Sequence, residues 1–360
     1  MAVAAVLLCV PLAAADLDAE TTGFDITDDT GTTYHFDGAA DHLVVQGAGA
    51  VLTVADAGAV DKIVAVDKYS TYSYTGYEQL ANLNAVDLGS FYGTTNHDAI
   101  VTELLNLVEA GSLHLDDPII LTSYSANATL KERLEDLDFT RVLSWNTSSG
   151  GDYSGIVSFV RDVTLIATGE ESTSVTEMQS IISQVQTTVS GATEKTRAIA
   201  LWYSSSSGLQ IINTGIAANM LEVCNAENIG YDASNSSMRY GDTNTIIQLL
   251  GENPGTVIFL SNAWETAGKT VQDFYDEVLG GSTDYKVVLM GALWNNYCPE
   301  SADGLLSMAQ SLYPELFGIE DEDNNGGSGD GSNAVLWGAA AVIVILIIAA
   351  AYVAFKRTHG

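Results

Sequence analysis

The residues best suited to chemistry in this sequence are aromatic and polar side chains that come directly after short β-prone runs. Large planar rings leave water when they stack, so such residues suit a site for a wide, flat, partly apolar molecule. The candidate ligand-binding residues are Gln46, Tyr69, Tyr72, Phe91, Tyr92, Tyr124, Trp145, Arg239, Tyr240, Trp264, Trp294 and Tyr297. The foremost are Trp145, Trp264 and Trp294, although aromatic residues at strand ends also pack under neighbouring loops.

Charged groups are scarce among these candidates. A strongly anionic ligand would call for several guanidinium groups pointing inward, and Arg239 is the only arginine in the set. The sequence therefore disfavours a strongly anionic ligand.

The histidines do not form a metal motif in the sequence. His35, His42, His97 and His114 all fall in the first half, and none pairs at the spacing typical of metal ligands. We therefore predict no metal site. His97, beside Asp98 at a predicted helix start, could still supply an axial imidazole to a bound metal chelate.

Catalytic motifs are missing from the sequence. It has no Gly-x-Ser-x-Gly elbow and no phosphate-binding Gly-x-x-x-x-Gly-Lys run. The run Gly47-Ala48-Gly49 is only part of a dinucleotide fingerprint. The sequence predicts a protein that is not an enzyme and has no cofactor.

Short strands and helices alternate through both halves of the chain, and they must position these residues. Predicted strands are 24–27, 32–36, 42–45, 62–66, 85–88, 118–122, 141–145, 198–203, 210–213, 256–260 and 286–290. Predicted helices are 51–58, 96–109, 127–137, 215–224, 246–250, 269–279 and 301–312. Such alternation predicts an α/β fold with mostly parallel sheets, in which ligand loops follow the carboxyl ends of the strands.

Two further helices separate the halves, within residues 153–190. Apolar residues recur at helical spacing up to Ile166, Gly169 interrupts the pattern, and a second periodic run begins at Val175. Ser174 and Glu177 form a capping-box signature for that second helix. Two lobes, at 16–152 and 191–318, joined by such a connection would leave a cleft between them, where small-molecule sites are common.

The two ends of the chain predict its location. Residues 1–15 resemble a signal peptide without a basic n-region, so an uncleaved anchor or a misassigned start stays open. Residues 335–355 are uncharged and, at about 1.5 Å per residue, long enough to cross roughly 30 Å of hydrocarbon. The basic tail 356–360 should be cytoplasmic, and the acidic segment 319–334 reads as a flexible linker. We expect a single-pass cell-membrane protein whose ligand-binding part is extracellular.

Composition excludes one class of partner. The 360 residues include 46 acidic and 13 basic ones, a formal net charge of −33. Phosphate groups would be repelled, so we expect no nucleic acid partner. The same charge also suits solubility and tolerance of salt.

Cysteines and sequons are compatible with an exterior location. Cys224 and Cys298 are the pair left after signal removal, so they form a candidate disulfide or act as two buried apolar residues. Asn127, Asn146 and Asn235 each begin a glycosylation sequon.

Several ordered segments resemble the helical-backbone, periplasmic-type substrate-binding proteins that serve importers of iron-siderophores, haem and cobalamin. The first-lobe segments are 25–36, 42–59, 61–67 and 89–91, and the second-lobe segments are 213–215, 253–254 and 312–317. The resemblance covers roughly residues 24–318. Each motif is short, and it is their order and spacing that identify the family.

This resemblance implies two Rossmann-like lobes bridged by a long helix, a ligand held in the cleft, delivery to an ABC-type permease, and no catalysis. Family members usually carry a surface acid on each lobe that docks the permease. Asp98 matches in the first lobe, whereas the corresponding second-lobe residues are Thr243 to Thr245, and Gly255 follows Asn253-Pro254.

We therefore expect a membrane-anchored solute-binding protein that captures a metal chelate such as cobalamin, haem or an iron-siderophore. The alternative is a cell-surface adhesion or envelope protein that keeps the fold without a transport role. A lobe pair of bacterial style on a C-terminal membrane tether suggests an archaeal source.

Overall fold

The computed structural model describes residues 23–70, 80, 83–91, 96–122, 124–146 and 153–319. The predicted signal peptide 1–15, the linker after Ile319, the predicted transmembrane helix 335–355 and the tail 356–360 lie outside these residues, as do Tyr72 and Tyr92. Within the described ranges, no helix combines the length and the apolar character needed to cross a bilayer.

The chain begins with the predicted hairpin. Strands β1 (Phe24–Thr27) and β2 (Thr33–Phe36) pair antiparallel. The buried Asp28 carboxylate organises the turn by accepting hydrogen bonds from the backbone N–H groups of Thr30 at 3.0 Å and Thr32 at 3.1 Å. Its other oxygen accepts from the Ser144 N–H at 3.0 Å, which fixes the hairpin to the first lobe.

The first lobe is a five-stranded sheet in the order β5-β4-β3-β6-β7, with every neighbouring pair parallel. The strands are β3 (Leu43–Val45), β4 (Ile63–Val66), β5 (Val86–Asp87), β6 (Ile119–Leu121) and β7 (Val142–Ser144). The accompanying helices are α1 (Ala48–Asp56), the 3-10 turn η1 (Val60–Lys62), α2 (His97–Glu109) and α3 (Tyr124–Glu135). Each predicted strand and helix of this half is present, with boundaries shifted by a few residues.

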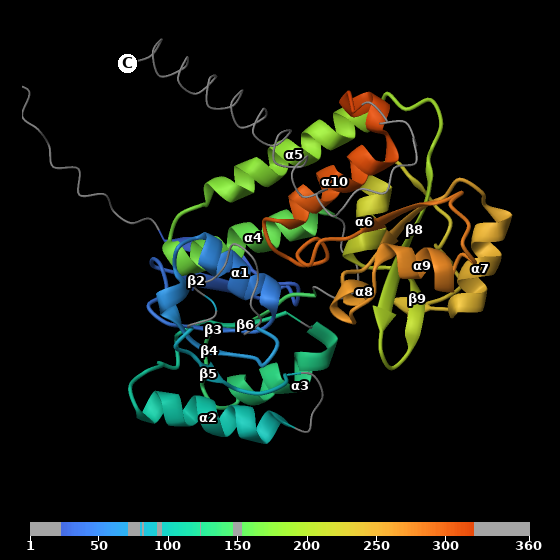
Figure 1. The fold of residues 1–360 in the computed structure, drawn as a ribbon. Helices are drawn as coiled ribbons and strands as arrows, with labels where there is room; N and C mark the ends of the chain where they lie inside the picture. The colour runs from blue at the N-terminus through green and yellow to red at the C-terminus, as the bar shows by residue number, and fades with distance from the viewer. Residues whose placement is uncertain are drawn as a thin grey trace, which may run out of the picture. The chain divides into compact units, whose positions relative to one another are not determined.

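Helices cover both faces of this sheet, which is why its inner strands β3, β4 and β6 are apolar throughout. Successive side chains of a strand point to opposite faces. Val44 accordingly belongs to the buried cluster that includes Ile100 of α2 and Leu130 of α3, whereas Val45 belongs to the cluster that includes Leu52 of α1. In Figure 1, α2 and α3 lie on the other side of the sheet from α1.

Helices α4 (Tyr153–Thr168) and α5 (Thr173–Val189) connect the lobes, as predicted. Gly169, with φ of 76°, separates them in a backbone conformation that favours glycine. The predicted capping residue is wrong by two positions. Ser172, not Ser174, caps α5, because its side chain accepts a hydrogen bond from the Ser174 N–H at 3.1 Å.

The second lobe has a mixed sheet in the order β11-β9-β8-β12-β13, with β10 also paired to β8. Strands β8, β12 and β13 are parallel, whereas β9 and β11 run antiparallel to their neighbours. The strands are β8 (Arg197–Ser204), β9 (Gly208–Ile212), β10 (Glu227–Asn228), β11 (Arg239–Tyr240), β12 (Val257–Leu260) and β13 (Lys286–Leu289). The helices are α6 (Ile216–Val223), α7 (Thr243–Glu252), α8 (Ala263–Thr266), α9 (Val271–Glu277), α10 (Ser301–Leu312) and the 3-10 turn η4 (Pro314–Phe317).

One hydrophobic core runs through both lobes. The same buried cluster contains Val45 of the first sheet, Phe159 of α4, Met178 of α5 and Phe259 of the second sheet. Helix α10 packs against α5, and the two lie side by side in Figure 1. The lobes are therefore joined by packed helices and shared apolar surface rather than by a flexible strand.

The two cysteines of the second lobe are not joined, so the candidate disulfide is absent. Cys224 and Cys298 are buried free thiols, and their sulfurs face the backbone carbonyls of Leu305 at 3.6 Å and Leu293 at 3.7 Å. Burial raises the pKa of the Cys298 thiol to about 12. Both side chains act as small apolar residues, which is the alternative that the sequence left open.

Candidate functional site

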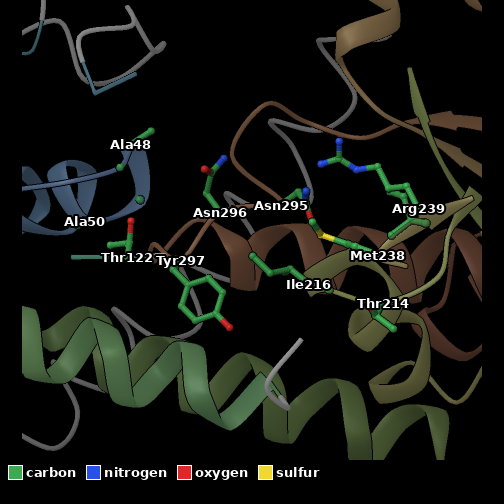
Figure 2. Close-up of a pocket in the computed structure, with 14 residues that line it drawn as sticks. Ala48, Ala50, Thr122, Thr214, Ile216, Met238, Arg239, Asn295, Asn296 and Tyr297 are labelled. Atoms are coloured by element: carbon green, nitrogen blue, oxygen red, sulfur yellow. The ribbon is translucent and has the colours of Figure 1, made fainter. Parts of the chain in front are cut away.

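A cavity of about 390 Å³ lies between the two lobes. The first lobe contributes Gly47, Ala48, Gly49 and Ala50 at the start of α1, and Thr122 just after β6. The second lobe contributes Ile212, Thr214, Gly215, Ile216, Met238, Arg239, Asn295, Asn296 and Tyr297. Figure 2 shows side chains from both lobes around this space. The first-lobe wall follows the carboxyl ends of β3 and β6, where the sequence predicted ligand loops.

Gly47 is the N-cap of α1 and allows the chain to turn from β3 into this helix beside the cavity. Its φ of 89° suits glycine, and a side chain there would put a Cβ 2.6 Å from the Thr122 hydroxyl oxygen. The Gly47 N–H donates to the Asp67 carboxylate at 3.1 Å, and the Ser70 hydroxyl donates to the same oxygen. Burial raises the pKa of Asp67, and these hydrogen bonds oppose that rise. The network fixes the first turn of α1 against the cavity.

The second-lobe wall repeats this arrangement of strand, glycine and helix. Gly215 has a φ of 106° and precedes α6, whose first turn borders the cavity. The Asn295 side-chain oxygen accepts the Ala217 N–H at 3.2 Å, which ties the loop before α10 to this helix. No acidic residue lies in the first turn of either α1 or α6. The N-terminus of α6 therefore brings partial positive charge to the cavity, whereas at α1 the Asp67 carboxylate, which accepts the Gly47 N–H, offsets part of that charge.

The lobes approach each other closely beside this cavity. A Cβ on Gly49 of α1 would lie 2.7 Å from the Tyr297 carbonyl oxygen and 2.9 Å from the Tyr297 backbone nitrogen. The Thr53 hydroxyl lies 3.4 Å from the same carbonyl oxygen. Gly49 is thus required for the contact between α1 and the loop that carries Asn295, Asn296 and Tyr297.

Arg239 provides a full positive charge at the cavity. Its guanidinium carbon lies 4.0 Å from the centroid of the Trp202 ring, and burial lowers its pKa without removing the charge. Asn296 and Thr122 add polar groups to the lining. The arrangement suits a ligand with several oxygen acceptors and negative charge, because helix N–H groups, amides and a guanidinium all donate hydrogen bonds.

Two of the predicted ligand-binding residues, Arg239 and Tyr297, line the cavity. Gln46 does not. It is buried, and its side-chain oxygen accepts hydrogen bonds from the Thr122 N–H at 2.9 Å and from the Asn127 side chain. It supports the first-lobe wall from behind. Asn127 is itself fully buried, so the folded chain does not expose this sequon.

The three tryptophans proposed as ligand walls lie outside the cavity lining. Trp145 packs edge-on against Phe159, with ring centroids 5.4 Å apart. The Trp264 indole N–H donates to the Thr270 carbonyl at 2.7 Å within the core of the second lobe. Trp294 packs against the backbone of Gly304. Among the described residues that line the cavity, Tyr297 is the only aromatic one.

The remaining predicted residues also lie elsewhere. Phe91 is fully buried in the core of the first lobe, and the Tyr240 hydroxyl donates to the Gly230 carbonyl at 2.9 Å. Tyr69 and His97 are not among the lining residues. The His97 ring is buried, and burial lowers its pKa. Tyr124 begins α3, and its side chain lies outside the described part of the chain.

Sequence reasoning missed most of the lining residues because they are small and lack reactive groups. The useful signal was a strand followed by glycine and a helix start, which occurs at Gly47 and again at Gly215. A search for this repeated pattern would have identified both walls. Asn295 and Asn296 lie between two of the candidates, Trp294 and Tyr297.

An exposed acid is found near the start of a helix in each lobe. Asp98 lies in the first turn of α2 and pairs with Arg133. In the second lobe, Asp242 caps α7 by accepting the Thr245 N–H at 2.9 Å. From the sequence, the corresponding second-lobe position was expected within Thr243 to Thr245, which contain no acid. The acid lies one residue before that segment.

Several solved structures of periplasmic binding proteins have a fold similar to that of this chain. The structure is similar to the periplasmic vitamin B12 binding protein BtuF of Vibrio cholerae, with 15% identity over 77% of this chain and 98% of that one, and a TM-score of 0.56. It is also similar to the periplasmic heme-binding protein RhuT from Roseiflexus sp. RS-1, with 13% identity, 77% and 100% coverage, and a TM-score of 0.55. A third similar structure is CeuE of Helicobacter pylori with Ni(II) bound. The identity is 13% over 83% of this chain and 91% of that one, and the TM-score is 0.57.

These similarities confirm, at the level of the fold, the resemblance recognised in the sequence. No protein-family model matches the sequence, and no curated protein matches it either. The chain therefore has the two-lobed fold of periplasmic binding proteins.

Proposed function

We propose that this protein is a solute-binding receptor that captures a metal chelate in the cavity between its lobes and delivers it to an ABC-type permease. The observation that carries the proposal is the cavity itself, lined by two helix N-termini and by Arg239. Solved structures with this fold include proteins named for binding vitamin B12 and heme. A binding role also agrees with the absence of catalytic motifs in the sequence.

Within the metal chelates, we propose a compact, oxygen-rich, negatively charged one, of the iron-siderophore type. The cavity, at about 390 Å³, lies toward the lower end of the roughly 300–1,000 Å³ range of ligand pockets. A porphyrin or corrin is a larger, flatter molecule and would need wider separation of the lobes. It would also find little aromatic surface among the described lining residues. Two expectations from the sequence are revised here. The site has little aromatic surface for stacking, and an anionic ligand, which the count of guanidinium groups alone disfavoured, is supported by helix N–H groups together with Arg239.

A spectroscopic titration of the purified chain tests this proposal. Ferric hydroxamate and ferric catecholate chelates, haem and cobalamin would be compared, with the metal-free chelators as controls. We expect saturable binding of a ferric chelate that is tighter than binding of haem or cobalamin. Tighter binding of haem or cobalamin would overturn the choice of chelate, and failure of all to bind below millimolar concentration would overturn the receptor function and leave the adhesion alternative.

We also propose that Asp98 and Asp242 dock the permease. Both are exposed acids near helix starts, one on each lobe. Asp98→Lys and Asp242→Asn should reduce uptake into cells while leaving chelate affinity unchanged. Asp136→Lys, which changes an exposed acid after α3, is the control that should transport normally. Equal uptake by all variants would remove the docking assignment.

The placement of the receptor follows from the chain ends and is part of the proposal. Residues 335–355 would anchor it in the cell membrane and hold residues 23–319 outside the cell. Protease treatment of intact cells should then release the ligand-binding part. Protection of that part in intact cells and its cleavage only after lysis would contradict this orientation.

A further inference from the structure

Three side chains that are far apart in the sequence converge at one edge of the first lobe. The Nδ1 atoms of His42 and His114 lie 3.0 Å and 3.3 Å from the same carboxylate oxygen, Oδ2 of Asp117. One ligand atom from each residue lies within 4.8 Å of the other two. The two imidazole rings have centroids 5.4 Å apart and are tilted by 50°.

The sheet brings these residues together. His42 directly precedes β3, and Asp117 comes two residues before β6. The two strands are parallel neighbours, with Val44 opposite Ile119, so the residues before them meet at one edge. His114 joins through a tight turn in which the Asp117 N–H donates to the His114 carbonyl at 3.2 Å. His42 and Asp117 are separated by 75 positions, which is why no spacing motif revealed them.

The spacing of these atoms suits a metal ion. Two ligands about 2.0–2.1 Å from a tetrahedral Zn²⁺ lie roughly 3.3 Å from each other. The Asp117 oxygen lies 3.0 Å and 3.3 Å from the two histidine nitrogens, close to that separation. To hold one ion, the exposed His114 ring and the half-buried His42 ring would turn their nitrogens from the carboxylate oxygen toward the ion.

The three side chains differ in their exposure to solvent, from Asp117, the most buried, to His114, the most exposed. The Asp117 side chain is 10% exposed, His42 30% and His114 60%. Asp117 is also held in place, because its Oδ2 accepts the His114 backbone N–H at 2.7 Å. The carboxylate is thus a fixed ligand, and the side open to solvent leaves room for water to complete the coordination. Asp41 and Asp116, exposed neighbours in the sequence, add negative charge that attracts a cation.

We propose that His42, His114 and Asp117 form a binding site for a first-row divalent transition metal, with Zn²⁺ as the reference ion. Two imidazoles and one carboxylate are a ligand set suited to Zn²⁺, Ni²⁺ and Cu²⁺, whereas Mg²⁺ and Ca²⁺ prefer all-oxygen ligands. A bound ion links the turn before β6 to the start of β3. It therefore stabilises the first lobe.

This site is distinct from the cavity between the lobes. His42 precedes β3, whereas Gly47, a cavity residue, follows it. Five steps of extended chain at about 3.3 Å each put roughly 16 Å between the two ends. A metal held here is consequently not the chelate captured between the lobes, and the proposal stands or falls independently of the transport function.

Metal binding by the full-length chain tests the site. The chain is stripped with a chelator and titrated with Co²⁺, whose visible absorption reports the ligand set, and then with competing Zn²⁺. The wild-type chain should bind one equivalent, and Zn²⁺ should displace the Co²⁺ and raise the melting temperature. His114→Asn and Asp117→Asn should each weaken binding by about tenfold or more, because each removes a ligand.

The matched control is His35→Asn. His35 also lies on the first lobe and contacts a carboxylate, Asp25, at 2.7 Å, but it is not part of the cluster. This variant should bind like the wild type. His114 is exposed, so His114→Asn should fold, and circular dichroism of the stripped protein would verify this. No stoichiometric binding by the wild type, or equal binding by wild type, His114→Asn and Asp117→Asn, would overturn the proposal and leave hydrogen bonds alone at this edge.

Discussion

The guanidinium carbon of Arg239 lies 4.0 Å from the centroid of the Trp202 ring. Arg239 comes from β11 and lines the cavity between the lobes, and Trp202 comes from β8. Stacking on the ring orients the guanidinium, and an arginine remains charged even where burial lowers its pKa. The cavity therefore has a fixed positive charge in a protein whose net charge is −33.

Replacing this charge should weaken capture of an anionic chelate. Arg239→Gln should lower the affinity for a ferric siderophore by about 10- to 100-fold, because a hydrogen bond to a charged group contributes roughly 1.5–3 kcal/mol. Isothermal titration would measure the change. Arg197→Gln, in the same lobe but exposed and paired with Glu227 at 3.5 Å, is the control. Equal affinity in the two variants would show that Arg239 does not contact the ligand.

Trp264 should matter for stability and not for binding. Its indole N–H donates to the Thr270 carbonyl at 2.7 Å, and its ring packs edge-on against Tyr203 and Phe274. Trp264→Phe should lower the free energy of unfolding by roughly 1–3 kcal/mol, because it loses the hydrogen bond and leaves unfilled space. Urea unfolding would measure the loss. A large fall in chelate affinity with unchanged stability would restore Trp264 as a ligand residue.

The contrast between Trp264 and Gly47 shows what the sequence could predict. Alternation of apolar runs located the main helices of both lobes and the strands except the two-residue β10 and β11, because each longer element buries a repeating apolar face. The four-residue α8 was missed since so short a helix has no period. An aromatic residue at a strand end can turn toward ligand or core, and only packing decides between them. The cavity walls are built instead by glycines and backbone groups, whose role depends on φ angles and on the distance between lobes.

The cluster of His42, His114 and Asp117 was hidden for a related reason. Sequence motifs for metals depend on ligands placed near one another along the chain, whereas here strand pairing brings together residues 75 positions apart. The cluster could be recognised only once β3 and β6 were known to be neighbours in the sheet.

Glu300 should make stability depend on pH. Burial raises the pKa of its carboxyl from 4.5 to about 7, and the charges of Asp56 and Asp303 add to the rise. The folded chain thus holds the proton more tightly than the unfolded chain, so stability falls as pH rises between about 4.5 and 7. Glu300→Gln should remove this fall and raise the free energy of unfolding at pH 8 by roughly 1–2 kcal/mol, after allowance for solvent screening of a partly exposed group.

Chemical unfolding at pH 5 and at pH 8 would measure the effect of Glu300. The control is Glu315→Gln, which changes an exposed acid on the 3-10 turn η4. If both variants kept the wild-type pH dependence, the Glu300 carboxyl would have an ordinary pKa and this explanation would fail.

The two cysteines should behave as free but protected thiols. Because Cys224 and Cys298 are buried, and burial raises the pKa of each thiol, an alkylating reagent should leave both unlabelled in the folded chain. After unfolding without reductant, both should be labelled, as peptide mass spectrometry would reveal. A disulfide-linked pair of peptides would instead support the bridge considered from the sequence.

Capture of a chelate between the lobes is the central claim, and hydrogen–deuterium exchange tests it most directly. The chain would be compared alone and saturated with its tightest ferric chelate, with Arg239→Gln as the control. Backbone amides at the starts of both α1 and α6, and in the loop 295–297, should exchange more slowly with the chelate bound, because all three segments border the cavity. Protection in one lobe alone, or only away from these segments, would contradict the account.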